Sequence, residues 1–273
     1  MKYIYLSCLI IFASFFNSCE DVVNVDLNAA PPKLVIDASI NWEKGTSGNL
    51  QKIKLTTTSD YFSSEIPTVS GATIFVKDSK NSNYDFIENA NTGEYFCTNF
   101  IPILNEEYTL TVIAKGQTYT AKETLLAIAP IDEIVQNNEG GILGNQIEIK
   151  SFYTDPKDSD NYYLYKYNYS NQIKSDYYVD EDNFFQGNTF FSLSQNEELK
   201  VGDVIEVKHF GISKRYYNYL SILLNISGNS GGGPFQSPPA TVRGNIINST
   251  DKNNFPLGYF SLSEVVTKRY TIK

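Results

Sequence analysis

From residue 34 to residue 122 the chain is a succession of short segments in which apolar and polar side chains alternate. A period of two places alternate side chains on one face of a β-strand. Gly, Asn, Asp, Ser or Pro residues separate most of the segments. Because closely spaced alternating strands are typical of sandwiches, residues 33–128 are predicted to form an Ig-like β-sandwich. The expected strands are 34–40, 51–58, 71–78, 84–87, 93–97, 107–114 and 117–122.

The rest of the chain, residues 129–273, is predicted to be a second β-rich domain that carries one α-helix. In segment 161–169 four tyrosines at odd positions share one face of a strand, and Tyr162 and Leu164 begin the other. A helix is expected near 213–226, where Ser213 can cap its start and an apolar stripe follows. The expected strands are 146–152, 161–169, 184–193, 201–210, 241–247 and 257–267, and the expected loops are 155–160 and 176–183.

Charge limits the kind of partner. The chain has 22 basic and 31 acidic residues, a formal net charge of −9. Nucleic-acid binding requires clustered basic side chains, whereas this sequence has three scattered arginines, Arg215, Arg243 and Arg269. We therefore expect no nucleic-acid partner.

The N-terminus has the pattern of a secretory signal peptide: Lys2, then an apolar run that ends at Phe16, then Asn17–Ser18. The run is shorter than the ~20 residues of a comfortable membrane span. Cys19 follows directly, and Ser18–Cys19 resembles the lipobox of bacterial lipoproteins, in which the thiol receives a diacylglyceryl group. We predict a signal peptide at residues 1–18 and a membrane anchor through lipid on Cys19. An ordinary signal peptide with an incidental cysteine and a plain N-terminal membrane anchor are the alternatives.

Residues 19–32 are predicted to be a lipidated, acidic tether, because Glu20 and Asp21 follow the cysteine at once. This acidic pair resembles the signal that exports Bacteroidota lipoproteins to the outer face of the outer membrane. An acidic but otherwise ordinary linker, with the protein facing the periplasm, is the alternative. With Cys8 removed and Cys19 modified, Cys97 has no disulfide partner and is expected to be a buried apolar side chain.

Several longer segments resemble a large uncharacterised lipoprotein family of Bacteroidota, the domain of unknown function 4249. They are Cys-Glu-Asp at 19–21, Pro-Lys-Leu-Val-Ile-Asp-Ala-Ser-Ile at 32–40, Gly-Pro-Phe-Gln-Ser-Pro-Pro-Ala-Thr-Val-Arg-Gly-Asn-Ile at 233–246, and Leu-Gly-Tyr-Phe-Ser at 257–261. Members of this family are often encoded beside TonB-dependent outer-membrane receptors. The resemblance implies an outer-membrane location and a role around uptake, and it supplies no catalytic residues.

Residues that could carry chemistry are few. His209, the only histidine, lies on an alternating segment and is expected to be structural. The acidic cluster Asp155, Asp158 and Asp160 is a weak candidate for Ca²⁺, but it lacks the spacing of an EF-hand, and a solvated turn is favoured. The run 180–182 is likewise expected to be a solvated loop. We expect no metal, no cofactor and no enzymatic activity, with paired carboxylates in a glycan hydrolase as an open alternative.

Aromatic residues in two polar loops are the candidate contact surface for a partner or ligand: Tyr177, Tyr178, Phe235 and Gln236. The predicted function is that of a surface-exposed outer-membrane lipoprotein, an accessory or ligand-binding partner of a TonB-dependent receptor. A structural or adhesive surface module is the alternative.

Overall fold

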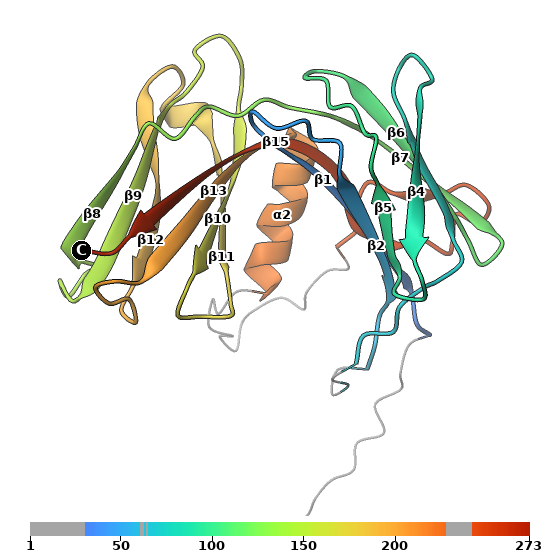
Figure 1. Cartoon of the computed structure of the whole chain (residues 1–273), viewed down its shortest axis with the longest axis horizontal. Coiled ribbons are helices and arrows are strands. Elements are labelled where there is room, and N and C mark those ends of the chain that lie inside the picture. Colours follow the sequence, from blue (N-terminus) through green and yellow to red (C-terminus); the bar gives the residue numbers. More distant parts are fainter. Residues whose placement is uncertain (1–30, 61–62, 64, 228–241) are drawn as a thin grey trace, which may run out of the picture. The chain divides into compact units, whose positions relative to one another are not determined.

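The structure is a computed structural model that describes residues 31–60, 63, 65–227 and 242–273 (Figure 1). Seven strands build the first half. They are β1 (Leu34–Glu43), β2 (Gln51–Thr57), β3 (Thr73–Lys77), β4 (Asn83–Asn89), β5 (Glu94–Cys97), β6 (Glu107–Ala114) and β7 (Gln117–Thr124). β1, β2 and β5 form one layer, and β3, β4, β6 and β7 form the other. β4 passes between the layers, because its first residues pair with β3 and its last residues pair with β5.

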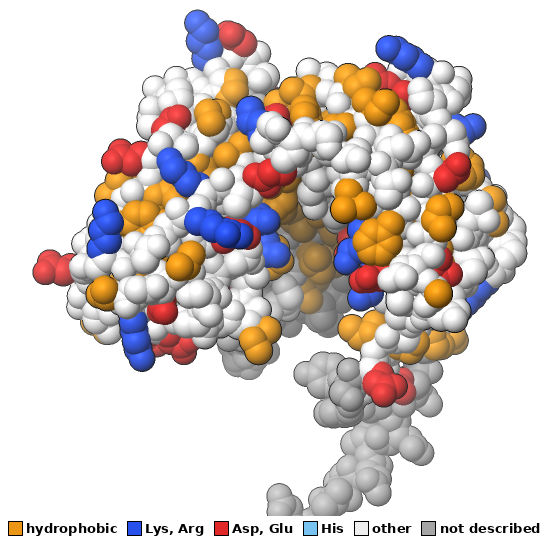
Figure 2. All heavy atoms as spheres, in the orientation of Figure 1, with side chains coloured by type: hydrophobic (Ala, Val, Ile, Leu, Met, Phe, Trp, Pro, Cys, Tyr) orange, Lys and Arg blue, Asp and Glu red, His pale blue; other side chains and the backbone are white. Residues whose placement is uncertain are grey.

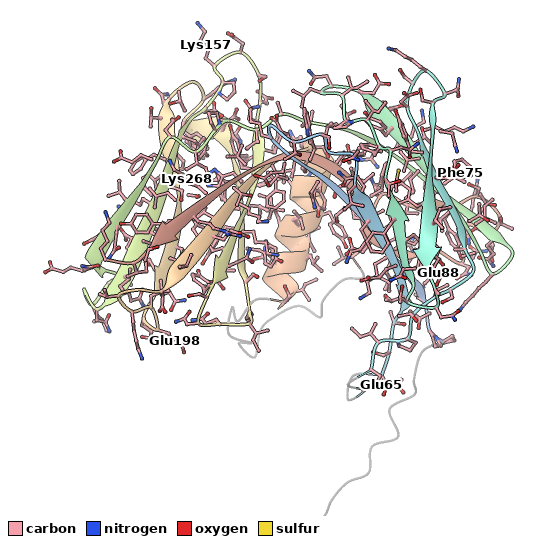
Figure 3. The ribbon with its side chains drawn as sticks, in the orientation of Figure 1. Glu65, Phe75, Glu88, Lys157, Glu198 and Lys268 are labelled. Carbon is pink, nitrogen blue, oxygen red and sulfur yellow. The ribbon has the colours of Figure 1, made fainter. Side chains whose placement is uncertain are left out.

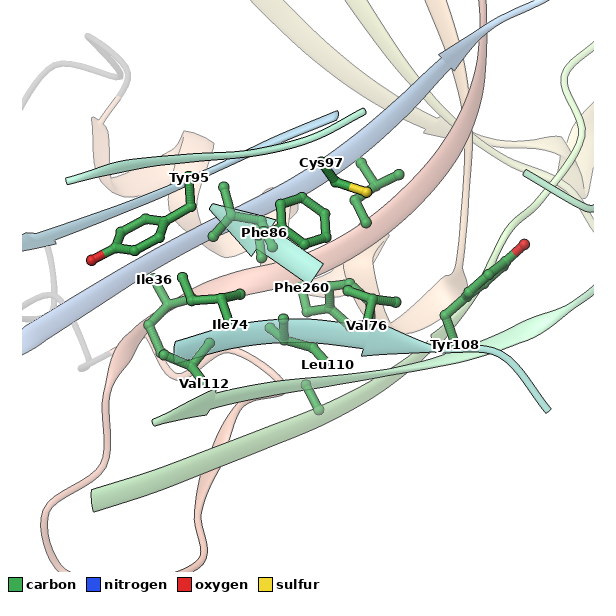
Figure 4. Close-up of a cluster of buried hydrophobic side chains, with 14 of the residues drawn as sticks. Ile36, Ile74, Val76, Phe86, Tyr95, Cys97, Tyr108, Leu110, Val112 and Phe260 are labelled. Carbon is green, nitrogen blue, oxygen red and sulfur yellow. The ribbon is translucent and has the colours of Figure 1, made fainter. Parts of the chain in front are cut away.

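Inward-facing side chains of both layers form the core of this first sandwich (Figure 4). Their positions follow the alternation of apolar and polar residues along each strand. Cys97 is buried among them, as predicted, and burial raises the pKa of its thiol. The largest inward-facing residues of the two layers include Ile36, Ile40, Ile53, Leu55, Ile74, Val76, Phe86, Tyr95, Tyr108, Leu110 and Val112.

Tyr108, at the start of β6, ties the strand to the loop before it. Its hydroxyl donates to the carbonyl of Ile101 at 2.8 Å and accepts from the N–H of Ile103 at 2.9 Å. A tyrosine bonded in this way to upstream backbone is typical of Ig-like sandwiches. With seven strands in two layers, it confirms the predicted fold of the first half.

The second half is also a sandwich, and it carries one helix, α2 (Lys214–Ser227). Its strands are β8 (Glu133–Gly140), β9 (Gln146–Thr154), β10 (Tyr162–Tyr169), β11 (Asp176–Glu181), β12 (Thr189–Asn196), β13 (Val204–Ile212) and β15 (Leu257–Thr271). A three-stranded sheet in the order β12-β9-β8 packs on the layer β11-β10-β13-β15. A 3-10 turn, η2 (Asp182–Phe184), follows β11, and the short β14 (Ile247–Asn248) pairs with β7 of the first sandwich.

The two faces of β10 are buried in different places, as the sequence predicts. Its four odd-numbered tyrosines lie in the core between the two sheets. Leu164 lies on the opposite face, where it packs with Leu220 of α2. Ser213 caps the helix, because its Oγ accepts the N–H of Tyr216 at 3.2 Å.

β15 connects the two sandwiches (Figure 1). Its first part pairs in parallel with β1, and its last part pairs with β13. At the junction Glu264 is buried and accepts from the N–H of Ile128 at 3.0 Å and from Lys44 Nζ at 3.2 Å. Residues Pro32–Lys273 accordingly form one compact unit.

The structure differs from the predicted elements in four segments, one of which, 133–140, was assigned no element. Residues 133–140 form strand β8, and 176–181 form strand β11 where a loop was expected. Both are edge strands, and acidic and polar residues on a sheet edge resemble a loop in sequence. Residues 242–246 are not a strand, and 184–188 are turns that precede β12.

Candidate functional site

Several predicted site residues lie outside the described part of the chain: Cys19, Glu20, Asp21, Phe235 and Gln236. The lipid-anchor and export-signal predictions, and half of the predicted contact surface, therefore stay predictions. In the ranges that the structure does describe, no helix combines the length and the apolar character needed to span a membrane.

Tyr177 and Tyr178 are neighbours on β11, so their side chains point to opposite faces of the sheet. The ring of Tyr178 packs edge-on against Tyr167 at 6.0 Å. On the other face, Lys166 Nζ lies 5.3 Å from the ring centre of Tyr177. Each tyrosine is about two-fifths exposed, Tyr177 43% and Tyr178 41%. The structure therefore does not bring the pair together on one contact surface.

The three candidate calcium ligands, Asp155, Asp158 and Asp160, differ in burial and in their hydrogen bonds. Asp155 is buried, and one of its oxygens accepts the hydroxyl of Tyr163 while the other accepts the N–H of Gly187 at 2.8 Å. Asp158 and Asp160 are exposed in the loop that follows. Among the described residues no group of three or more His, Cys, Asp or Glu side chains is placed to hold a metal ion. The carboxylate of Asp155 instead fixes the start of β10.

The acidic run 180–182 is not a solvated loop. Asp182 is buried, and one of its carboxylate oxygens accepts the N–H of Asn161 at 2.6 Å. Burial raises the pKa of the Asp180 and Asp182 carboxyls. These residues hold the start of β10 next to the end of β11. Their role is therefore in packing, although their charge in the sequence is typical of a solvated loop.

His209 lies in the core of the second sandwich. Its Nε2 is 2.8 Å from Ser192 Oγ, which is 2.7 Å from the hydroxyl of Tyr167. Its Nδ1 has no hydrogen-bond partner in the described part of the chain. Burial lowers the pKa of the imidazole to about 3, so the ring is neutral at physiological pH. An enclosed neutral ring of this kind has no route to a substrate, and the position is a structural one.

Four exposed aliphatic side chains that the sequence did not point to lie on hairpin loops of the second sandwich. Leu143 is 83% exposed and Val201 77%, while Ile142 and Ile173 are fully exposed. These residues belong to the loops 141–145, 170–175 and 197–203, which we call the hairpin end.

Strand pairing puts the three loops of the hairpin end together. Antiparallel pairing places Ile147 of β9 opposite Asn196 of β12, and Ser170 N donates to the carbonyl of Val204 at 2.9 Å. The side chains of Asn171 and Gln172 donate to Glu198 at 3.0 and 2.8 Å. In Figure 3 Glu198 marks this end of the sandwich, and Lys157 marks the opposite end.

The hairpin end can bind apolar surface. Single exposed aliphatic residues are ordinary, whereas several on neighbouring loops at one end of a sandwich are a candidate contact site. Figure 2 shows hydrophobic, basic and acidic side chains interspersed over this face of the molecule, around a hollow between the two sandwiches. The signal in the sequence was the presence of isoleucine, leucine or valine inside turns, at positions such as Ile142 and Ile173.

The fold and these surfaces define a mainly β, two-sandwich protein with exposed aliphatic side chains on its loops. The chain belongs to the family described as "Domain of unknown function (DUF4249)", whose model matches residues 20–269. No curated protein matches it.

Solved structures with partial similarity include a two-domain fibronectin type III segment of chicken tenascin, with 10% identity and a TM-score of 0.23, covering 66% of this chain and 90% of that one. A pullulanase from Anoxybacillus sp. LM18-11 has 12% identity and a TM-score of 0.22, covering 64% of this chain and 24% of that one. The FN1–FN3 domains of chicken CNTN1 have 14% identity and a TM-score of 0.22, covering 87% of this chain and 65% of that one.

Proposed function

We propose that this protein is a non-enzymatic lipoprotein of the outer membrane, anchored through Cys19 and facing outside. There it acts as an accessory or ligand-binding partner of a TonB-dependent receptor. The observation that carries the proposal is the hairpin end, where four exposed aliphatic side chains lie on three neighbouring loops. Apolar side chains are costly to leave in water, and a bound partner would cover them.

The sequence supports the location. An apolar run before Ser18–Cys19 resembles a lipoprotein signal, and Glu20 and Asp21 resemble a surface-export signal. Lipid attachment would hold the protein at the membrane, because each buried CH₂ of an acyl chain contributes ~0.8 kcal/mol. Members of the family that the sequence resembles are often encoded beside TonB-dependent receptors, which supports the choice of partner.

Burial of the hairpin end would contribute favourable free energy to a contact. Full burial of a Val, Leu or Ile side chain contributes about 1.5–3 kcal/mol. The side chains of Ile142, Leu143, Ile173 and Val201 could therefore supply several kcal/mol before the cost of association is subtracted. A receptor barrel in the same membrane also meets the anchored protein at a high effective concentration, so that a modest affinity is enough.

The test is affinity purification of the tagged protein from gently solubilised outer membranes, with mass spectrometry of what is recovered. We expect a TonB-dependent receptor with the wild-type protein and its loss with Cys19→Ala, which cannot carry the lipid. The triple variant Ile142→Ser, Leu143→Ser, Ile173→Ser keeps the lipid and is expected to recover about tenfold less receptor or lower.

A matched triple variant on the first sandwich, Ile87→Ser, Ile101→Ser, Ile247→Ser, also removes three exposed aliphatic side chains and serves as the control. It is expected to recover as much receptor as the wild type. Equal recovery with both triple variants would remove the hairpin end from the proposal. Absence of palmitate incorporation into the wild-type protein would overturn the proposed anchoring, and capture of a matrix or adhesion protein in place of a receptor would favour a structural module.

A further inference from the structure

A pocket of about 330 Å³ lies between α2, the segment 242–245 and the start of β15. This volume is at the small end of the ~300–1,000 Å³ of small-molecule sites. Its lining combines cationic, amide and aromatic side chains from elements far apart in the sequence. The residues that give it this character are Arg215, Asn218, Tyr219, Arg243, Asn245 and Tyr259.

Two of the three arginines of the chain line this one pocket. Within the described ranges, neither Arg215 nor Arg243 has a carboxylate within ion-pair distance, whereas Arg269 pairs with Glu206 at 2.9 Å. The concentration of positive charge is notable because the chain as a whole has a net charge of −9. The buried Glu123 lies near enough to Arg215 for the guanidinium to counter part of the rise that burial gives to the pKa of this carboxyl. With one neighbouring carboxylate and two arginines in its lining, the pocket favours an anionic ligand.

The guanidinium of Arg243 is held by stacking. Its Cζ lies 3.7 Å from the ring centre of Phe255, and Lys33 Nζ lies 3.5 Å from the same ring centre. A stacked guanidinium is fixed through its flat face, and the N–H groups at its edge stay free to donate in the plane. This geometry suits bidentate bonds to a carboxylate or phosphate.

Aromatic rings form the other part of the pocket. Tyr219 and Tyr259 lie with ring centres 4.8 Å apart, and Tyr216 also packs on Tyr259 at 4.5 Å. The hydroxyl of Tyr259 donates to the buried Glu123 at 3.2 Å, which fixes this ring. Tyr259 is itself buried under these rings, whereas Tyr219 is partly exposed and offers an apolar surface on which the C–H face of a sugar ring or a similar body can pack.

We propose that this pocket binds a small organic anion, with its carboxylate or phosphate on Arg215 and Arg243 and its body on Tyr219. The inference rests on the proposed function, in that it names the class of ligand that the accessory protein would present to its receptor. The same anionic group occurs in acidic sugars and in sugar phosphates, and these are the two sources that the experiment separates.

The experiment is calorimetric titration of the full-length protein in detergent with three matched probes: galactose, galacturonate and galactose 6-phosphate. At least one anionic probe is expected to bind about tenfold or more tightly than galactose, because charge-assisted bonds to arginine are lost with the neutral sugar. The probe that binds identifies the source. Binding is expected to weaken as NaCl is raised.

Three substitutions of arginine by glutamine separate the pocket from the net charge. Arg215→Gln and Arg243→Gln are each expected to weaken binding about tenfold or more, whereas Arg269→Gln, with the same loss of charge, is expected to bind normally. Arg243→Lys keeps the positive charge but loses the paired N–H donors of the guanidinium, and it is also expected to bind the anion more weakly. Circular dichroism of each variant controls for folding.

Equal affinity for galactose and the two acids, no saturable binding of either acid, or an equal loss with Arg269→Gln would overturn the inference. Receptor capture with the same arginine variants keeps the two proposals apart. Capture without anion binding overturns the ligand class alone, and anion binding without capture overturns the receptor partnership alone.

Discussion

The side-chain amide of Asn245 forms two hydrogen bonds with the backbone of Phe260. Its Nδ2 donates to the carbonyl of Phe260 at 2.8 Å, and its Oδ1 accepts the N–H of Phe260 at 2.9 Å. Phe260 lies on β15, where Ala38 of β1 is opposite it on one edge and β13 begins to pair only at Val265. Asn245 therefore takes the place of a neighbouring strand on the other edge, which explains why residues 242–246 are not themselves a strand.

Asn245→Ala is expected to lower the free energy of unfolding by about 2–4 kcal/mol, because it leaves a buried N–H and a buried carbonyl without partners. Urea denaturation followed by circular dichroism measures this. Asn253→Ala, at an exposed position in the same connection, is the control and is expected to stay within about 0.5 kcal/mol of wild type. A similarly small change for Asn245→Ala would contradict the role of the amide.

Gly258 allows β15 to approach β1 closely. It has φ of +96°, and a Cβ there would lie 2.0 Å from the carbonyl oxygen of Ile36. Gly258→Ala is expected to cost more than about 3 kcal/mol, because left-handed strain and a backbone clash add. Gly116→Ala measures the backbone strain alone, because Gly116 has φ of +73° and open space around it. The expected loss in free energy of unfolding for this variant is about 1–2 kcal/mol. Equal losses for the two variants in urea denaturation would exclude the clash.

His209 should make the protein less stable as the pH falls. The pKa of its imidazole is about 3 in the folded protein and ~6.5 when unfolded, so between these values the unfolded chain binds the proton and the folded chain does not. Stability relative to His209→Gln is therefore constant above about pH 7 and falls below it, by up to about 1.4 kcal/mol per pH unit. Denaturation at a series of pH values measures the difference, and parallel curves for the two proteins would disprove it.

The thiol of Cys97 is expected to react very slowly with alkylating reagents in the folded protein. Its side chain is 1% exposed, so a reagent has little access to the sulfur. Burial also raises the pKa of the thiol, which lowers the fraction present as the reactive thiolate. Alkylation by iodoacetamide at pH 8 is expected to be at least about a thousandfold slower than in urea, because it requires opening of the first sandwich. Mass spectrometry of the peptide around Cys97 gives the rate, with Cys97→Ala as the blank. Comparable rates in buffer and in urea would show that the thiol is accessible.

Local patterns were sufficient for most of the β-structure. Alternation identified the strands of the first sandwich, and Ser213 identified the start of α2, because side-chain periodicity and helix capping depend on residues close in sequence. The opposite faces of β10 followed from the same period of two. The edge strands β8 and β11 were missed, since their exposed polar residues resemble those of loops.

The candidate sites depended on long-range pairing. No local pattern places Ile142, Ile173 and Val201 at one end of a sandwich, because the register of four separate strands brings their loops together. Arg215 and Arg243 likewise meet only through the packing of α2 beside β15. Periodicity is a property of neighbouring residues and can be seen in the chain itself, whereas a surface is assembled from residues whose contacts exist only after the strands have paired.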